Sequence, residues 1–212
     1  MADRELRGLY VVTSDTEDTR TLLLRVHAAL SGGARFVQYR NKAASSALRW
    51  EQASALKALC DDHDASLIVN DHATLALEID AAGVHLGAED GDIAAARALL
   101  GGAKIIGISC YDRLELARAA ETAGADYVAF GSFFASLVKP GAVRASLDLL
   151  QAARRELKVP IAAIGGITLD NASSLVDAGA DSIAVISALF TAPDVTAAAR
   201  RFTALFGTGD GS

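Results

Sequence analysis

The stretch Ala123-Gly124-Ala125-Asp126-Tyr127-Val128 has a near copy, Ala178-Gly179-Ala180-Asp181-Ser182-Ile183, later in the chain. Weaker versions occur at Ala82-Gly83-Val84 and at 33–37. A glycine that ends a helix in the left-handed conformation and leads directly into a strand accounts for each of them. These junctions predict a helix-to-strand unit that repeats along the chain.

The hydrophobic pattern around these junctions alternates between two kinds of segment. Short runs rich in β-formers predict strands at 8–13, 36–40, 67–71, 83–86, 104–109, 127–131, 161–164 and 182–187. Apolar residues three and four apart predict helices at 21–30, 47–60, 74–79, 93–100, 114–123, 147–157, 171–178 and 195–205. Alternating strands and helices imply parallel pairing and right-handed crossovers.

Eight such units predict a single (β/α)8 (TIM) barrel over residues 1–206, followed by a polar, glycine-rich and disordered tail at 207–212. An open doubly wound sheet is the alternative. That fold usually has a glycine-rich first turn, and Thr13-Ser14-Asp15-Thr16 is not one. In a barrel the site lies at the carboxyl ends of the strands.

Composition narrows the class of protein. The 212 residues are 51% apolar and 22% charged, as in an ordinary globular protein, and no apolar run approaches the ~20 residues that span a bilayer. We expect a cytoplasmic protein without a signal peptide or membrane partner. The net charge of -6 argues against a nucleic-acid surface, but a few basic groups can still bind an anionic small molecule. Cys60 and Cys110 have no metal-ligand spacing, and we expect both to be reduced and buried or inert.

Two carboxylates follow neighbouring predicted strands. Asp71 ends the run Leu67-Ile68-Val69-Asn70-Asp71, and Asp90 follows the strand at 83–86. Mg²⁺ takes oxygen ligands and is usually held by one or two carboxylates together with substrate phosphates. Asp71 and Asp90 are therefore the candidate Mg²⁺ ligands. The alternative is that Asp71 caps the next helix and Asp90 lies in a polar turn.

Basic residues cluster at two other predicted strand ends. Gln38, Arg40 and Lys42 alternate along the chain, so strand geometry would turn all three to one side, where a diphosphate fits them. A solvated strand end is the alternative. Lys139 lies in the long segment 130–141, which could close over a ligand or be an ordinary loop. Gly165-Gly166 after the seventh strand, and the end of the eighth, suit a phosphate.

The histidines are less informative. His27 and His63 fall on predicted helices and are expected at the surface, and His72 and His85 are interpreted as structural. No position supports a Ser-His-Asp or Cys-His pairing, so we expect no covalent catalysis.

The ordered motifs resemble those of the thiamine-phosphate synthase family, in which a pyrimidine diphosphate and a thiazole phosphate are joined with Mg²⁺ and pyrophosphate is released. The similar stretches are Val37-Gln38-Tyr39-Arg40-Asn41-Lys42, Val69-Asn70-Asp71, Gly83-Val84-His85-Leu86-Gly87-Ala88-Glu89-Asp90, Gly107-Ile108-Ser109, Phe130-Gly131 through Lys139, Ile164-Gly165-Gly166-Ile167 and Val185-Ile186-Ser187.

The resemblance implies a role for each matching position. Asp71 and Asp90 would hold Mg²⁺. The pyrimidine diphosphate would contact Gln38, Tyr39, Arg40, Asn41, Lys42, Asn70, Ser109 and Lys139, and the thiazole phosphate would contact Ser136, Leu137, Val138, Gly166, Ile186 and Ser187. The catalytic set would be Arg40, Lys42, Ser109 and Lys139. The partners would be these two small molecules, and a homo-oligomer stays open.

Two positions depart from the family's usual pattern. Ser136-Leu137-Val138-Lys139 stands where Thr-Pro-Thr-Lys is common, and Asn41 stands where an acid is usual. The first change puts the affinity for the thiazole phosphate in question. The alternatives are a thiazole tautomerase paralogue, which would not need the metal pair, a more remote sugar-phosphate isomerase or epimerase, and a non-catalytic phosphate-binding regulator.

Overall fold

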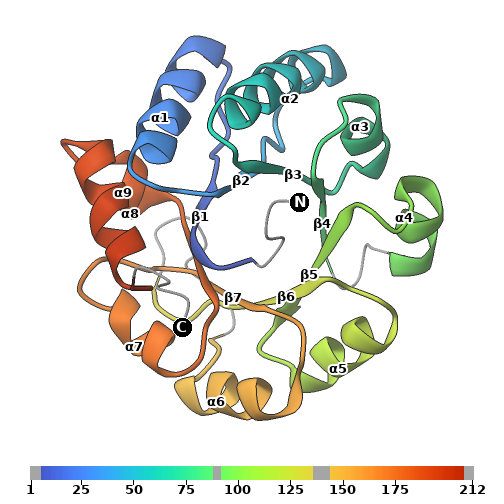
Figure 1. The fold of residues 1–212 in the computed structure, drawn as a ribbon, viewed down its shortest axis with the longest axis vertical. Helices are drawn as coiled ribbons and strands as arrows, with labels where there is room; N and C mark the ends of the chain where they lie inside the picture. The colour runs from blue at the N-terminus through green and yellow to red at the C-terminus, as the bar shows by residue number, and fades with distance from the viewer. Residues whose placement is uncertain (1–5, 88–91, 136–143, 208–212) are drawn as a thin grey trace.

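The computed structural model describes residues 6–87, 92–135 and 144–207. Its strands form a closed parallel barrel in which each strand pairs with its neighbours in sequence order, and β1 pairs with β8 to close the ring (Figure 1). The strands are β1 Gly8–Val12, β2 Phe36–Tyr39, β3 Ser66–Asn70, β4 Gly83–Gly87, β5 Ile105–Tyr111, β6 Tyr127–Phe130, β7 Ile161–Ile164 and β8 Ser182–Val185.

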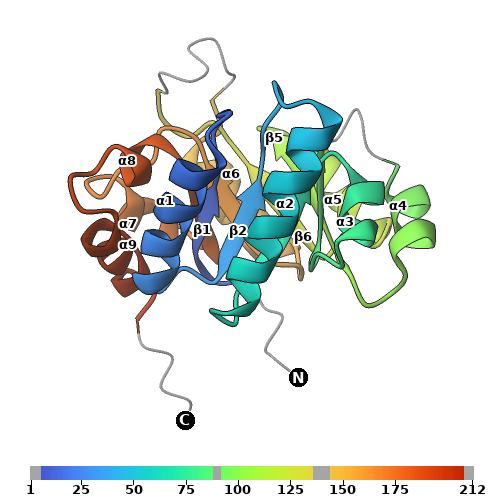
Figure 2. The same cartoon turned by 90° about the horizontal axis from the view of Figure 1, so that it is seen from above.

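Helices surround the barrel on all sides (Figures 1 and 2). They are α1 Thr19–Ser31, α2 Ser46–Asp61, α3 Ala73–Glu78, α4 Ile93–Leu100, α5 Leu114–Thr122, α6 Leu147–Glu156, α7 Ala172–Asp177, α8 Ser187–Phe190 and α9 Val195–Ala204. Within the described residues, no helix is long and apolar enough to cross a membrane.

Side chains on the strands divide between two apolar layers, because successive residues of a strand point to opposite faces. Along β1, Leu9 and Val11 pack outward in the layer shared with the helices, whereas Tyr10 and Val12 point into the barrel. The barrel interior is therefore filled by side chains rather than hollow, as in other barrels of this size.

The repeated junctions have a common structural cause. Gly124 and Gly179 adopt φ angles of 92° and 105°, which lie in the left-handed region that favours glycine. Two residues after each glycine, an aspartate carboxylate accepts a hydrogen bond from a backbone N–H at the start of a neighbouring strand. Asp126 accepts from Ile106 at 2.7 Å, and Asp181 accepts from Ile161 at 2.9 Å. Each junction thus ends a helix and fixes the start of two strands.

The predicted fold class is confirmed, since the structure is an eight-stranded parallel barrel with alternating helices. The predicted ranges 93–100 and 161–164 coincide with α4 and β7. The short helix α8, between β8 and α9, was not predicted. The tail from residue 208 onward lies outside the described residues. Cys60 and Cys110 are free and buried, as expected.

Candidate active site

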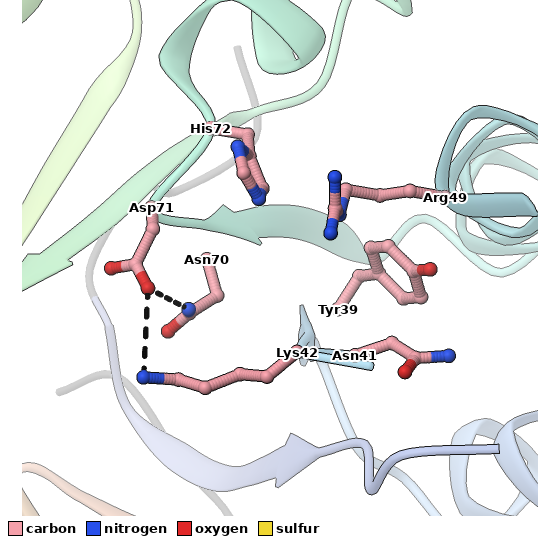
Figure 3. A pocket seen from close by; sticks show the side chains of 7 residues that line it. All are labelled: Tyr39, Asn41, Lys42, Arg49, Asn70, Asp71 and His72. Atoms are coloured by element: carbon pink, nitrogen blue, oxygen red, sulfur yellow. Dashed lines mark hydrogen bonds and ion pairs between the residues drawn. The ribbon is translucent and has the colours of Figure 1, made fainter. Parts of the chain in front are cut away.

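Asp71 stands directly after β3, with a φ of 62°. Its carboxylate accepts a hydrogen bond from Asn70 Nδ2 at 2.6 Å and lies 4.0 Å from Lys42 Nζ (Figure 3). The residue at the N-cap of α3 is His72, and no side chain caps that helix. The alternative interpretation of Asp71 as a helix cap is therefore wrong, and its carboxylate is available at the barrel mouth.

Asp90, the expected second Mg²⁺ ligand, lies outside the described residues. The structure describes the chain up to Gly87 and again from Asp92. β4 pairs with β3 through Asn70 and His85, and Asp71 N–H donates to the His85 carbonyl oxygen at 2.9 Å. The chain consequently leaves β4 at the rim where Asp71 stands. Among the described residues, no three His, Cys, Asp or Glu side chains gather as a metal site. One exposed carboxylate at a strand end still suits Mg²⁺, which needs few protein ligands.

Arg40 and Lys42 reach the mouth for a reason other than the one predicted from strand alternation. β2 ends at Tyr39, so both residues follow the strand instead of belonging to it. Asp15 organises them: its Oδ1 accepts from the Lys42 backbone N–H at 2.9 Å and lies 3.6 Å from Arg40 Nη1. Asp15, Arg40, Lys42 and Asp71 are called the charged rim below.

The remaining residues of this motif point in different directions. Gln38 is buried and faces the barrel interior, whereas Tyr39 faces outward, where its hydroxyl donates to Gln52 Oε1 on α2 at 2.9 Å. Asn41 Nδ2 donates to the Thr16 carbonyl oxygen and to the same Gln52 oxygen. Asn41 therefore points toward α2 and away from Lys42 and Asp71 (Figure 3).

A cavity of about 250 Å³ lies beside Asp71 and is lined by Tyr39, Asn41, Lys42, Arg49, Asn70, Asp71 and His72 (Figure 3). Arg49 and His72 were not predicted here. Arg49 lies in the first turn of α2, and that turn stands at the mouth because α2 follows β2. Burial, together with the nearby Arg49 cation, lowers the pKa of His72. The cavity thus carries two cations and two amides next to one carboxylate.

Below the rim, five polar side chains form a continuous row of hydrogen bonds across the barrel. Gln38 Nε2 donates to Tyr10 Oη at 3.0 Å, and Tyr10 Oη lies 2.8 Å from Tyr127 Oη. Tyr127 Oη lies 2.8 Å from His85 Nδ1, and His85 Nε2 lies 2.8 Å from Ser109 Oγ. We call these five residues the interior network. It joins Gln38 on β2 to Ser109 on β5, two residues for which the family resemblance implies contact with one substrate.

The interior network is uncharged at neutral pH. Burial lowers the pKa of His85 to about 4 and raises the pKa of Tyr10 to about 12. Burial also raises the pKa of Tyr127 well above its ordinary value. The contact between His85 and Ser109 was not predicted from the sequence. The other ring nitrogen of His85 faces the Tyr127 hydroxyl rather than a carboxylate. A histidine that holds a proton so weakly is a poor base, so the arrangement does not activate Ser109 as a nucleophile.

Gly107 makes room for the network. A Cβ atom on Gly107 would lie 2.0 Å from Tyr127 Cζ and 2.4 Å from its hydroxyl oxygen. The Tyr127 ring therefore occupies the space that any side chain at 107 would need, and its T-shaped contact with Tyr10 and its stacking on His85 depend on that space.

At the other side of the mouth, Gly165 and Gly166 have φ angles of 103° and 66°. A Cβ on Gly166 would lie 2.5 Å from the Ala135 carbonyl oxygen, so both conformation and space require glycine. Ile186 precedes α8 and Ser187 begins it, so a short extra helix follows β8, as in phosphate-binding barrels. Ser136, Leu137, Val138 and Lys139 lie outside the described residues.

The chain is similar to known proteins over nearly its whole length. The family model described as thiamine monophosphate synthase matches residues 9–189. The chain is 54% identical to a thiamine-phosphate synthase of Nitrosospira multiformis over 203 residues, 96% of this chain and 87% of that one. It is 56% identical to that of Thiobacillus denitrificans over 199 residues, 94% of each chain.

Solved structures agree with this similarity. A thiamine phosphate pyrophosphorylase from Pyrococcus furiosus superimposes with a TM-score of 0.84 at 36% identity, covering 96% of both chains. A 3-hexulose-6-phosphate synthase superimposes with a TM-score of 0.70 at 22% identity, over 94% of this chain and 99% of that one, a likeness of fold alone.

Proposed function

The chain belongs to the thiamine monophosphate synthase family and is a thiamine-phosphate synthase, and on this premise we propose which residues of the barrel mouth carry out the reaction. The enzyme is a transferase that joins a pyrimidine bearing a diphosphooxymethyl arm to a thiazole phosphate. The bond between the methylene carbon and the diphosphate oxygen breaks, pyrophosphate leaves with the electron pair, and the thiazole nitrogen bonds to the methylene.

The pyrimidine ring binds at the barrel axis in this proposal, against Gln38, Asn70 and Ser109. Gln38 and Ser109 end the interior network, and Asn70 ends β3 next to them in the barrel wall. Amide and hydroxyl groups match the hydrogen-bonding edge of an aminopyrimidine, and their strands hold them before substrate arrives. Tyr39 and Asn41 face α2, which supports a role in shaping the cavity wall rather than in direct contact with the ring.

The diphosphate binds to the charged rim through Arg40 and Lys42, joined by Lys139. Both described cations already lie beside carboxylates, Arg40 beside Asp15 and Lys42 beside Asp71. The Lys42 side chain is 58% exposed, so its 4.0 Å pairing with Asp71 is weak and can be exchanged for a phosphoryl oxygen. Arg49, which lines the same cavity, adds a further positive charge.

Mg²⁺ is the cofactor in this proposal, held by Asp71 and Asp90 together with the diphosphate. When bound, it supplies positive charge that stabilises the departing diphosphate. The Asp71 carboxylate suits this role because it is exposed at a strand end and its hydrogen bond from Asn70 engages Oδ2, which leaves Oδ1 for a metal.

The thiazole phosphate binds on the other side of the mouth, to Gly166, Ile186 and Ser187, with Ser136, Leu137 and Val138. The glycine pair and the first turn of α8 offer backbone N–H groups near the ends of β7 and β8. The proposal therefore sets the two phosphate-bearing groups on separate parts of the rim, with the two rings between them.

The residues of the mouth suit a dissociative substitution. The electron-rich aminopyrimidine stabilises positive charge on its methylene as the carbon–oxygen bond breaks, and the attacking nitrogen carries no proton to remove. No general base is needed, in keeping with a His85 that stays neutral within the interior network. Arg40, Lys42, Lys139 and Ser109 form the catalytic set: the cations neutralise the leaving group and Ser109 holds the ring in line.

The observation that carries this assignment is that Gln38 and Ser109, on β2 and β5, and Arg40, Lys42 and Asp71, which follow β2 and β3, lie toward the carboxyl ends of their strands. The test is incubation of the purified protein with both substrates and Mg²⁺, with pyrophosphate and thiamine phosphate measured separately. We expect the two products in equal amounts, and neither when one substrate is left out.

The same assay separates the alternatives. A thiazole tautomerase would convert its thiazole without the pyrimidine and without releasing pyrophosphate, and a non-catalytic regulator would bind substrates without forming product. We propose that the two small molecules are the partners, that the enzyme works in the cytoplasm, and that a homo-oligomer is compatible with a site built from one chain.

A further inference from the structure

The direction of hydrogen bonding along the interior network follows from its first contact, in which Gln38 Nε2 donates to Tyr10 Oη. Each buried O–H or N–H requires an acceptor, because an unpaired buried polar group costs on the order of 1–3 kcal/mol. Tyr10 Oη accepts from Gln38, and within the described residues the acceptor for its own proton is Tyr127 Oη. Tyr127 must then donate to His85 Nδ1.

The direction continues through the imidazole to the mouth. A neutral histidine carries one ring proton, and an Nδ1 that accepts leaves that proton on Nε2. His85 Nε2–H therefore donates to Ser109 Oγ. In the reverse direction Tyr127 would donate to Tyr10, whose own buried proton would have no acceptor among the described residues.

We propose that Tyr10, Tyr127 and His85 are positioning residues that fix Ser109 as a hydrogen-bond donor toward the substrate. This rests on the proposed function, in which Ser109 binds the pyrimidine. Ser109 Oγ accepts from His85 and is partly exposed, so its own proton points to an acceptor in the mouth, which an unprotonated ring nitrogen of the aminopyrimidine supplies. A ring with N–H at that position would face a second donor and be rejected.

The first test reads the direction without any substrate. Nitrogen-15 NMR of the ligand-free protein distinguishes the two neutral tautomers of His85, whose signal is identified by its loss in His85→Gln. We expect Nε2–H alone in the native protein at neutral pH, and a mixture in Tyr127→Phe, where Nδ1 has lost its donor. An Nδ1–H tautomer in the native protein would overturn the assigned direction.

The second test measures the consequence for binding. Calorimetric titration with Mg²⁺ compares the pyrimidine diphosphate with analogues in which each ring nitrogen in turn is C–H. We expect one analogue to bind the native protein roughly tenfold more weakly, the effect of one lost hydrogen bond to a fixed donor. In Tyr127→Phe the same replacement should cost much less. Equal losses in both proteins would overturn the positioning role.

Controls separate positioning from general damage. Ser182→Ala removes another buried hydroxyl, which donates to the Gly8 carbonyl oxygen at the opposite end of the barrel, and should leave the discrimination unchanged. Tyr10→Phe should reproduce Tyr127→Phe, and thermal unfolding checks that both variants fold. If the native protein fails to bind the pyrimidine diphosphate, the proposed function is wrong, while the NMR result still decides the direction of the network.

Discussion

The interior network and the charged rim are neighbouring parts of the barrel, and in our proposal they recognise ligands by opposite means. The network is largely buried and neutral, and each of its four contacts measures 2.8–3.0 Å. The rim is partly exposed, and its cations lie 3.6 and 4.0 Å from carboxylates. One region has a single arrangement before any ligand arrives, and the other has charges that can change partners.

The difference matches the ligand that we propose for each region. A flat heterocycle is distinguished by its pattern of donors and acceptors, which requires groups whose directions are already fixed. A diphosphate is recognised mainly by charge, and exposed cations with loosely held partners can meet it at little cost in desolvation. Substitutions in the two regions should therefore fail in different ways.

The largest effect is expected at the rim, from Asp71→Asn. This change keeps the shape of the side chain but removes the charge proposed to hold Mg²⁺, so kcat should fall at least about a hundredfold, consistent with loss of several kcal/mol of charge stabilisation. The rate of pyrophosphate release against Mg²⁺ concentration measures it. Asp62→Asn, at the exposed C-cap of α2, is the control and should behave as the native protein. Near-native turnover of Asp71→Asn at limiting Mg²⁺ would exclude Asp71 as a ligand.

Within the interior, Gly107→Ala should destabilise the fold by about 2–3 kcal/mol, because the new methyl group would overlap the Tyr127 ring and displace it. Urea unfolding measures the free energy, and the surviving folded protein should also bind the pyrimidine diphosphate more weakly. Gly102→Ala is the matched control, since its Cβ would meet nothing within 4 Å. Equal stability of the two variants would show that the Tyr127 ring is not held in this position.

Acid should destabilise the barrel interior. His85 has a pKa of about 4 in the folded protein, below its ordinary value near 6.5, so the unfolded chain takes up a proton first as the pH falls. The stability contributed by neutral His85 is complete above pH 6.5 and is lost between 6.5 and 4. The free energy of unfolding should fall by about 2 kcal/mol from pH 7 to pH 5.

Urea titrations of the native protein and of His85→Gln, which cannot titrate there, isolate this contribution. The pKa of His72 is lowered too, so the free energy of unfolding of His85→Gln should still depend partly on pH. That remaining dependence should disappear when His72→Gln is added to the same variant. A slope unchanged by His85→Gln would mean that the buried imidazole does not stay neutral.

The smallest effect is expected from Arg40→Lys at the rim. The charge is kept and the planar fork is lost, so the KM for the pyrimidine diphosphate should rise by roughly tenfold while that for the thiazole phosphate stays the same. Arg118→Lys, which changes an exposed pair with Glu156 on the outer helices, is the control. Equal changes in both KM values would place Arg40 outside the diphosphate site.

Most elements of the barrel were predictable because a local hydrophobic pattern marks each of them in the sequence. The period of 93–100 and the apolar run at 161–164 suffice to define α4 and β7. α8 was missed because its four residues are too few to show a helical period. β2 was extended by one residue at Arg40, and that extension produced the wrong reason for the direction of Arg40 and Lys42.

The site was only partly predictable, since its residues meet through the closed ring. Arg40, Lys42 and Asp71 could be proposed because charged side chains after a strand are conspicuous in a sequence. The contact between Tyr10 and Tyr127 joins residues 117 positions apart, and no local pattern signals it. His85 looked structural for the same reason: its importance comes from its two partners and not from its neighbours in sequence.

The positive φ of Asp71 has one further consequence. Few residue types other than glycine, asparagine and aspartate adopt this backbone shape without strain, and of these three only aspartate carries an acid. Glutamate, which has the same charge on a longer side chain, would carry an added conformational cost of about 1–2 kcal/mol at this position. A substitution at position 71 must therefore tolerate the positive φ and also keep the negative charge. Measurements of folding and of turnover for all nineteen alternatives should separate the two requirements.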